Sequence, residues 1–168
     1  IYILPNNKNI ILAARQAAEL TKDRRVLVVP SATIPQGITA LVNFMPDLPP
    51  EENMKNMEQE MAQVHTAQIT YAVRPAVVDG VEIHEGDIMA LGDKGLLAVG
   101  SSAFETGIAA IRAMLAGDAE LLTIYYGSEV PEEEALRLKE AGEELFPDKE
   151  FEIQYGGQPI YYYIISAE

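Results

Sequence analysis

Hydrophobic residues in the first third of the chain follow the two patterns that predict a strand, a helix and a second strand. Residues 1–4 and 26–29 are short continuous apolar runs, which are typical of strands buried on both faces of a sheet. Between them, apolar residues recur at helical spacing from residue 10 to residue 20. This order predicts two parallel strands joined by a crossover helix.

Two further helices are predicted before the middle of the chain. Thr33 precedes Gln36 by three residues and Pro35 lies between them, which is a capping-box start. Glu51 and Glu52 begin the next helix, whose apolar face is rich in methionine. That face is either core or a plastic docking surface, and it consists of Met54, Met57, Met61 and Val64.

From about residue 68 to residue 100 the apolar period changes to two. Apolar and polar residues alternate from residue 68 to residue 74, which predicts a half-buried strand. Asp79-Gly80 lies between two β-branched runs, and this is a strong hairpin signal. Residues 92–95 indicate a second hairpin. The region is therefore predicted to be an antiparallel β-rich part of a single α/β domain that spans residues 1–168.

The last third returns to a mixed pattern. A second capping box begins a helix at residues 102–105, and residues 121–126 form an apolar run before a glutamate-rich helix. The strands at 151–155 and 160–165 are predicted to form a C-terminal β-hairpin. The predicted fold class is α/β, with a mostly parallel sheet flanked by helices, an antiparallel hairpin insert and this C-terminal hairpin.

Composition excludes several functional classes. The formal net charge is −14, from 26 acidic and 12 basic residues, which argues against binding to nucleic acids or to anionic membranes. The chain has no cysteine, and its two histidines, His65 and His84, lie far apart, so we expect no metal site. No apolar run is long enough to insert into a membrane.

The sequence motifs of common nucleotide and hydrolase sites are also missing. The chain has no phosphate-binding loop, no dinucleotide fingerprint and no serine nucleophile elbow. We therefore expect no catalytic residue within these residues.

Polar side chains cluster where the first two strands end. In an α/β sheet, ligands bind beside the carboxyl ends of strands and the adjoining helix N-termini. The same residue types also cap helices and stabilise turns, so both interpretations stay open. The candidate ligand-binding or partner-binding residues here are Asn6, Asn7, Lys8, Asn9, Thr33 and Gln36.

A third candidate segment is Gly156-Gly157-Gln158-Pro159. Two glycines permit positive φ and close backbone approach, and proline stiffens the exit from the turn. A turn explains the glycines but does not require Gln158. The tyrosines at 161–163 pack on the sheet or reach a partner, since tyrosine is favoured at interfaces.

Three motifs in order resemble the C-terminal domain of the ATP-binding subunit of bacterial fatty-acid kinase, a dihydroxyacetone-kinase-related family. They are Ile-Leu-Pro-Asn-Asn-Lys-Asn-Ile at residues 3–10, the segment from Pro30 to Gly37, and Gly-Gly-Gln-Pro-Ile-Tyr at residues 156–161. The resemblance covers essentially the whole chain.

The resemblance implies a larger cytoplasmic parent protein, and the chain's start inside an apparent strand also suggests a fragment. Such a parent phosphorylates the carboxylate of a fatty acid that a separate DegV-like carrier protein presents, and the acyl phosphate feeds phospholipid synthesis. ATP and magnesium are expected in the parent's N-terminal domain, so this fragment is expected to hold no cofactor. The partners to consider are the carrier, the remaining domains of the parent and, in a homodimer, a second copy of the chain.

Three functions therefore remain to be compared. The first is a non-catalytic domain that helps to dock the fatty-acid carrier. The second is a site for a small carboxylate or phosphate at the carboxyl ends of the strands. The third is a structural or oligomerisation role.

Overall fold

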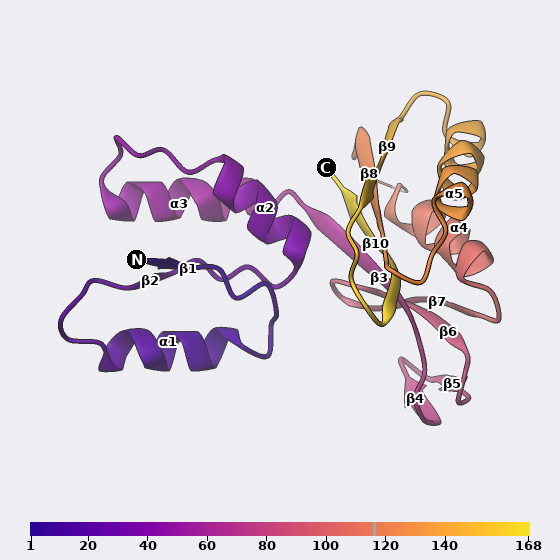
Figure 1. Ribbon diagram of the computed structural model, residues 1–168, viewed down its shortest axis with the longest axis horizontal. Helices are drawn as coiled ribbons and strands as arrows, with labels where there is room; N and C mark the ends of the chain where they lie inside the picture. The colour runs from indigo at the N-terminus through magenta and orange to yellow at the C-terminus, as the bar shows by residue number, and fades with distance from the viewer. Residues whose placement is uncertain (116) are drawn as a thin grey trace. The chain divides into compact units, whose positions relative to one another are not determined.

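The chain folds into two compact units, residues 1–64 and residues 65–168 (Figure 1). The computed structural model describes residues 1–115 and 117–168. Each unit has its own hydrophobic cluster. The two units are therefore described separately.

Unit 1 contains the predicted strand–helix–strand order. Strands β1 and β2 pair in parallel, with Tyr2 opposite Leu27 and Ile3 opposite Val28, as the apolar pattern predicted. Its elements are β1 (Tyr2–Ile3), α1 (Ile11–Leu20), β2 (Leu27–Val28), α2 (Ile34–Val42) and α3 (Pro50–Met61).

The core of unit 1 lies where α2 and α3 pack near the two strands. The methionine face of α3 belongs to this core, so the core interpretation of that face is confirmed for Met57 and Met61. Asn53 is 1% exposed and holds the turn between the helices. Its Oδ1 accepts from the Met45 N–H at 3.1 Å, and its Nδ2 donates to the Met45 carbonyl at 2.7 Å.

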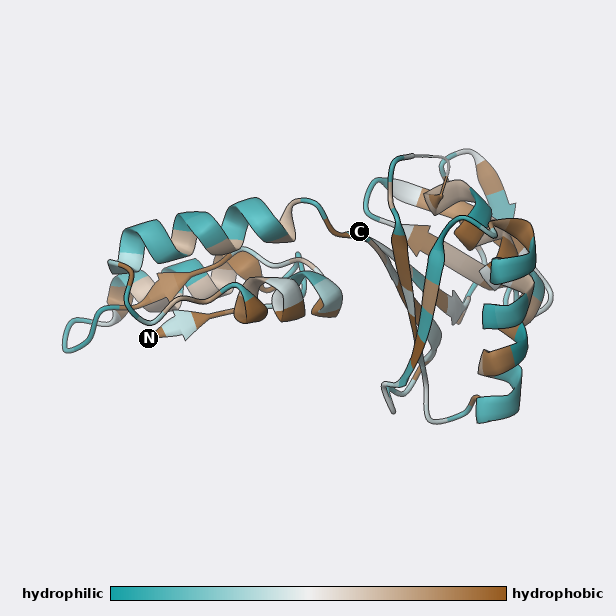
Figure 2. Ribbon diagram, turned by 90° about the horizontal axis from the view of Figure 1, so that it is seen from above, coloured by the Kyte–Doolittle hydropathy of each residue, from teal (hydrophilic) through white to brown (hydrophobic). Residues whose placement is uncertain are grey.

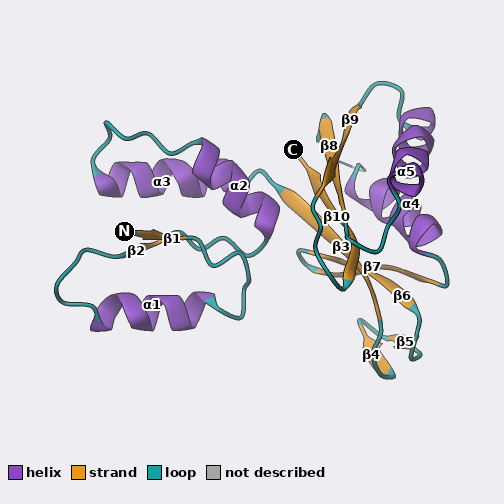
Figure 3. Ribbon diagram, viewed as in Figure 1, coloured by secondary structure: helices purple, strands orange, loops and turns teal. Residues whose placement is uncertain are grey.

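Unit 2 is a six-stranded sheet with two helices packed on one face (Figure 3). The strand order is β7-β6-β3-β10-β8-β9. The strands are β3 (His65–Tyr71), β6 (Ile88–Gly92), β7 (Gly95–Gly100), β8 (Leu121–Tyr126), β9 (Glu150–Tyr155) and β10 (Tyr161–Ala167), and the helices are α4 (Ala103–Met114) and α5 (Glu132–Leu145).

The α/β class and the helices flanking the sheet are confirmed, but the larger sheet is mostly antiparallel rather than mostly parallel. Among its described strands, only β8 and β9 pair in parallel, because they are the only neighbouring strands of the sheet that a crossover helix, α5, joins. Hairpin connections and the antiparallel insertion of β10 between β3 and β8 set the other directions.

The antiparallel insert at about 68–100 is confirmed and lies in unit 2. Asp79 and Gly80 have φ values of 51° and 80°, as a tight hairpin turn requires. They join β4 (Ala76–Val78) to β5 (Val81–Ile83) in a separate small sheet. Strands β6 and β7 form the second predicted hairpin.

The predicted C-terminal hairpin is wrong. Strand β8 lies between β9 and β10, so the two last strands do not pair with each other. Residues 156–160 instead cross the end of β8, which pairs with one strand on each edge. The two glycines were correctly placed in a turn, but the turn spans a third strand.

The core of unit 2 lies between the sheet and its two helices. Figure 2 shows that both the strands and the helices of this unit carry hydrophobic as well as hydrophilic residues. Among the described residues, no helix is long and apolar enough to cross a membrane. The most deeply buried large side chains of this core include Ile69, Ile111, Leu122, Ile124, Leu138, Tyr163 and Ile165.

Candidate functional site

Asn6 joins the loop after β1 to the start of α2. Its backbone N–H donates to Ser31 Oγ at 3.1 Å, and that hydroxyl donates to Asn6 Oδ1 at 2.7 Å. Asn6 has a φ of 54°, a left-handed conformation that asparagine tolerates better than most residues. Its amide lies so close to Gly37 that a Cβ there would overlap it. Asn6 therefore holds the loop after β1 against the start of α2.

Thr33 and Gln36 lie close to these Asn6 contacts, at the N-terminus of α2. Thr33 Oγ1 accepts from the Gln36 N–H at 3.4 Å, which confirms the predicted cap. The Gln36 side chain accepts from the Ala32 N–H at 2.9 Å and donates to the Val64 carbonyl at 3.4 Å. The structure thus brings Asn6, Thr33 and Gln36 to the strand ends, where their bonds are those of caps and turns.

The other three polar candidates of unit 1 form an exposed turn that leads into α1. Asn7 Oδ1 accepts from the Asn9 N–H at 2.9 Å, and the Asn7 carbonyl accepts from the Ile10 N–H at 3.0 Å. Lys8 is exposed between them. This is an asparagine-stabilised turn, a role that the residue type favours.

The segment from residue 155 to residue 160, called here the β9–β10 loop, is fastened to the end of β8. The Gly156 and Gly157 N–H groups donate to the Tyr126 carbonyl at 3.0 and 3.2 Å. Gln158 Nε2 donates to the Tyr125 carbonyl at 2.9 Å, and the Gln158 carbonyl accepts from the Ser128 N–H at 3.1 Å. These bonds explain why residue 158 is a glutamine, which a simple turn would not require.

Glycine is required on both sides of this contact. Gly157 has a φ of 63°, in the left-handed region that favours glycine. At Gly127, a Cβ would overlap the carbonyl oxygens of Gln158 and Tyr161. Because those atoms belong to the backbone, they cannot rotate away, and the close approach depends on this glycine.

Ile160 ends the β9–β10 loop in a strained conformation. Its φ is 74°, and the Tyr161 N–H donates to the Pro159 carbonyl at 2.8 Å across it, which makes a γ-turn. The Ile160 carbonyl accepts from Thr70 Oγ1 at 3.0 Å. A positive φ is unusual for a β-branched residue. The Ile160 side chain is nevertheless 56% exposed.

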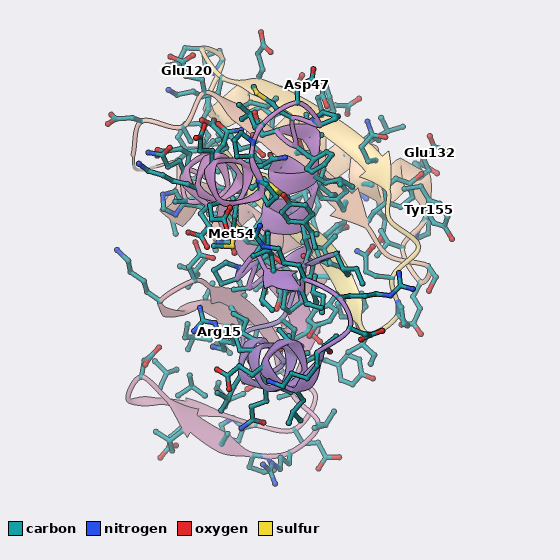
Figure 4. All side chains as sticks on the ribbon, turned by 90° about the vertical axis from the view of Figure 1, so that its left-hand side faces the viewer. Arg15, Asp47, Met54, Glu120, Glu132 and Tyr155 are labelled. Carbon is teal, nitrogen blue, oxygen red and sulfur yellow. The ribbon has the colours of Figure 1, made fainter. Side chains whose placement is uncertain are left out.

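Tyrosine rings surround this end of the sheet. The Tyr126 and Tyr155 ring centroids lie 5.3 Å apart, and those of Tyr71 and Tyr162 lie 6.2 Å apart. Loss of hydration raises the pKa of the Tyr126 hydroxyl, and the negative charge of Glu132 and the nearby Tyr155 raise it further. Figure 4 shows Glu132 and Tyr155 on the same side of the molecule.

A row of buried hydroxyl side chains was missed by sequence reasoning. The core residues Ile69, Ile124 and Ile165 face the helices, so their neighbours along each strand face the opposite side of the sheet. The alternation within residues 65–71 was the signal that could have revealed them. They are Thr66, Thr70, Thr123 and Ser166.

No cluster of metal-binding side chains occurs in residues 1–115 or 117–168. The two histidines lie in separate exposed pairs, His65 with Asp93 at 3.2 Å and His84 with Asp87 at 3.5 Å. Neither pair has the third ligand that a metal centre requires.

Comparison with protein families gives a match over the complete sequence. The model of the FakA-like C-terminal family, which describes the C-terminal part of the A-like subunits of fatty acid kinase, matches residues 1–168. Protein YloV of Bacillus subtilis (strain 168) is 39% identical over 168 residues, which are 100% of this chain and 30% of that protein. Uncharacterized protein SAR1202 of Staphylococcus aureus (strain MRSA252) is 39% identical over 166 residues, 99% of this chain and 30% of that protein. The chain therefore spans less than a third of these relatives.

Solved structures of similar fold include a fatty acid kinase B3 protein and a DegV family protein. The Streptococcus pneumoniae fatty acid kinase (Fak) B3 protein loaded with linoleic acid matches with a TM-score of 0.65 at 16% identity, over 100% of this chain and 71% of that one. A DegV family protein from Ruminococcus gnavus with vaccenic acid matches with a TM-score of 0.64 at 15% identity, over 100% and 71%. At these identities the likeness establishes the fold alone. The sequence match over the whole length shows that this chain belongs to the FakA-like C-terminal family of fatty acid kinase.

Proposed function

We propose that this chain is a non-catalytic domain of a fatty-acid kinase that helps to dock a fatty-acid-binding carrier protein. The parent enzyme then phosphorylates the carboxylate of the carried fatty acid. The observation that carries the proposal is the family match over residues 1–168. The shared fold with proteins that hold linoleic or vaccenic acid supports a partner of that kind.

The arrangement of polar side chains supports a contact role over a chemical one. At the strand ends of unit 1, Asn6, Thr33 and Gln36 are engaged by Ser31 and by backbone groups. In unit 2, Gln158 is engaged by β8. The parent's ATP and magnesium site belongs in this proposal to residues outside the chain, which spans 30% of protein YloV.

The experiment is a calorimetric titration of this chain with the DegV-type carrier of the same genome, loaded with oleic acid. We expect a dissociation constant on the order of micromolar, as for transient complexes with small interfaces. Because the chain carries a formal charge of −14, raising NaCl from about 0.1 M to about 0.5 M should weaken binding. Absence of heat at carrier concentrations of about 100 μM would rule out docking by this chain.

A second candidate is a small carboxylate or phosphate site in unit 1. It is favoured by the convergence of Asn6, Thr33 and Gln36 at the carboxyl ends of β1 and β2. NMR titrations of the labelled chain with acetate and with inorganic phosphate test it. Saturable shifts of the amides of residues 6 and 31–37 would support this site, and an unchanged spectrum would exclude it.

A further inference from the structure

The β9–β10 loop, residues 155–160, is held rigid although it lies at the surface. Both of its glycine N–H groups bind β8, and Gln158 binds β8 through its side chain and the following segment through its carbonyl. The Thr70 hydroxyl holds its last residue. A surface loop fixed in this way loses little conformational freedom when a partner binds, which favours affinity.

Strain in the loop is located at Ile160. Isoleucine at a φ of 74° is disfavoured, and a side chain that is 56% exposed gains little packing in return. Glycine or asparagine would fit this backbone with less strain. Strained backbone that the surroundings hold in place occurs preferentially at functional sites.

Two large side chains of the loop are exposed together. Tyr155 is 67% exposed and Ile160 is 56% exposed. The ring of Tyr155 is supported from one side by Tyr126 and lies against Gly157, so its orientation is set before any partner arrives. Tyrosine is enriched among the residues that dominate binding energy at interfaces.

The charged residues in the two segments that flank the loop contacts, 126–136 and 150–168, are all acidic. The negative charge of Glu132 raises the pKa of Tyr126, whose ring supports Tyr155. Glu129 directly follows Ser128, whose N–H donates to the Gln158 carbonyl. No lysine or arginine occurs in residues 126–136 or 150–168. A basic surface is therefore the favoured complement, and a second copy of this face would bring carboxylates against carboxylates.

We propose that the β9–β10 loop is the docking surface, with Tyr155 and Ile160 inserted into an apolar recess of the carrier that lysine and arginine residues surround. This assignment rests on the proposed function and adds to it the contact residues and the chemistry of the partner's face. The strained turn orients Ile160 outward for this contact.

The test compares variants of the whole chain in the carrier titration. Ile160→Asn keeps a residue that tolerates positive φ, and Tyr155→Ala leaves the backbone bonds of the loop in place. Each should weaken binding by about tenfold or more. The matched control is Val77→Ser, which removes a 69% exposed apolar side chain from the β4–β5 hairpin and should change affinity by less than about twofold.

Two charge-reversal variants complete the test. Glu132→Lys should weaken binding, whereas Glu144→Lys, at the other end of α5, should leave it unchanged. Circular dichroism verifies that each variant is folded.

The outcomes separate the two proposals. If the unmodified chain binds and the loop variants bind equally well, this assignment is overturned while carrier docking stands. If the unmodified chain does not bind, both fall. If light scattering shows instead that the loop variants convert a dimer to a monomer, the loop is a contact between copies and the carrier assignment is overturned.

Discussion

Replacing Tyr163 by phenylalanine should stabilise unit 2. The Tyr163 side chain is 0% exposed, and its hydroxyl has no hydrogen-bond partner among the residues that the structure describes. A buried polar group without a partner costs about 1–3 kcal/mol. We therefore expect Tyr163→Phe to raise the free energy of unfolding at neutral pH by about 1 kcal/mol, taking the lower end of that range.

The same substitution should change the response to alkaline pH. Burial, the largest cause, and the nearby Glu134 together raise the pKa of the Tyr163 hydroxyl to about 12, although Arg137 lowers it. Between pH 10 and 12 the unfolded chain loses this proton while the folded chain keeps it. The contribution of Tyr163 to stability is therefore fully present below pH 10 and is lost as the pH rises toward 12. The loss attributable to Tyr163 is roughly 3 kcal/mol over the whole interval, and about half of it is reached by pH 11.

Urea unfolding followed by circular dichroism, from neutral pH to about pH 11, measures both effects. The control is Tyr125→Phe, which removes a hydroxyl that is hydrogen-bonded to Ser166 and should cost about 1 kcal/mol. A Tyr163→Phe chain that is less stable than the unmodified protein and equally sensitive to alkali would refute the reasoning. Such a result would mean that the Tyr163 hydroxyl has a hydrogen-bond partner in solution.

Two further substitutions test the contacts that shape each unit. Gly127→Ala should lower the unfolding free energy of unit 2 by about 2–3 kcal/mol, because the new Cβ overlaps backbone oxygens, including that of Tyr161. Gly117→Ala, where the Cβ meets open space, is the control and should stay within about 0.5 kcal/mol in the same urea titration. In unit 1, Asn53→Ala leaves the N–H and carbonyl of Met45 unpaired, so thermal unfolding should show a loss of about 2–3 kcal/mol. An unchanged midpoint would show that water replaces the Asn53 side chain.

Local signals in the sequence predicted local structure well. The capping box at Ser102 and Glu105 begins α4 as expected, with the Glu105 N–H donating to Ser102 Oγ at 3.4 Å. The Asp79-Gly80 hairpin also forms as expected. Each of these features depends on residues that are near in sequence, where the side-chain chemistry largely determines the backbone.

Strand partners were not predictable in the same way. Alternating hydrophobicity identifies which face of a strand is buried, but it does not specify the neighbour. Strand β10 was therefore predicted to pair with β9, whereas it pairs with β3 and β8. The apolar pattern likewise could not show that residues 1–64 and 65–168 pack into separate cores.

The candidate site was predicted in its residues but not in its bonds. Asn6 was expected at a strand end, but its partner Ser31 lies 25 residues away. Gln158 was singled out because a turn did not require it, and the carbonyl that it binds lies 33 residues away, on Tyr125. The strain at Ile160 has no sequence signal, because it arises where tertiary contacts fix a backbone that isoleucine does not prefer.

An NMR titration of this 18.4 kDa chain with its oleate-loaded carrier tests the central claim most directly. The ¹⁵N-labelled chain is observed while unlabelled carrier is added. Carrier docking predicts saturable changes in the spectrum, and the loop assignment places them at the amides of residues 155–161 and in the adjoining residues 127–133. A spectrum that stays unchanged with carrier in excess would contradict the account.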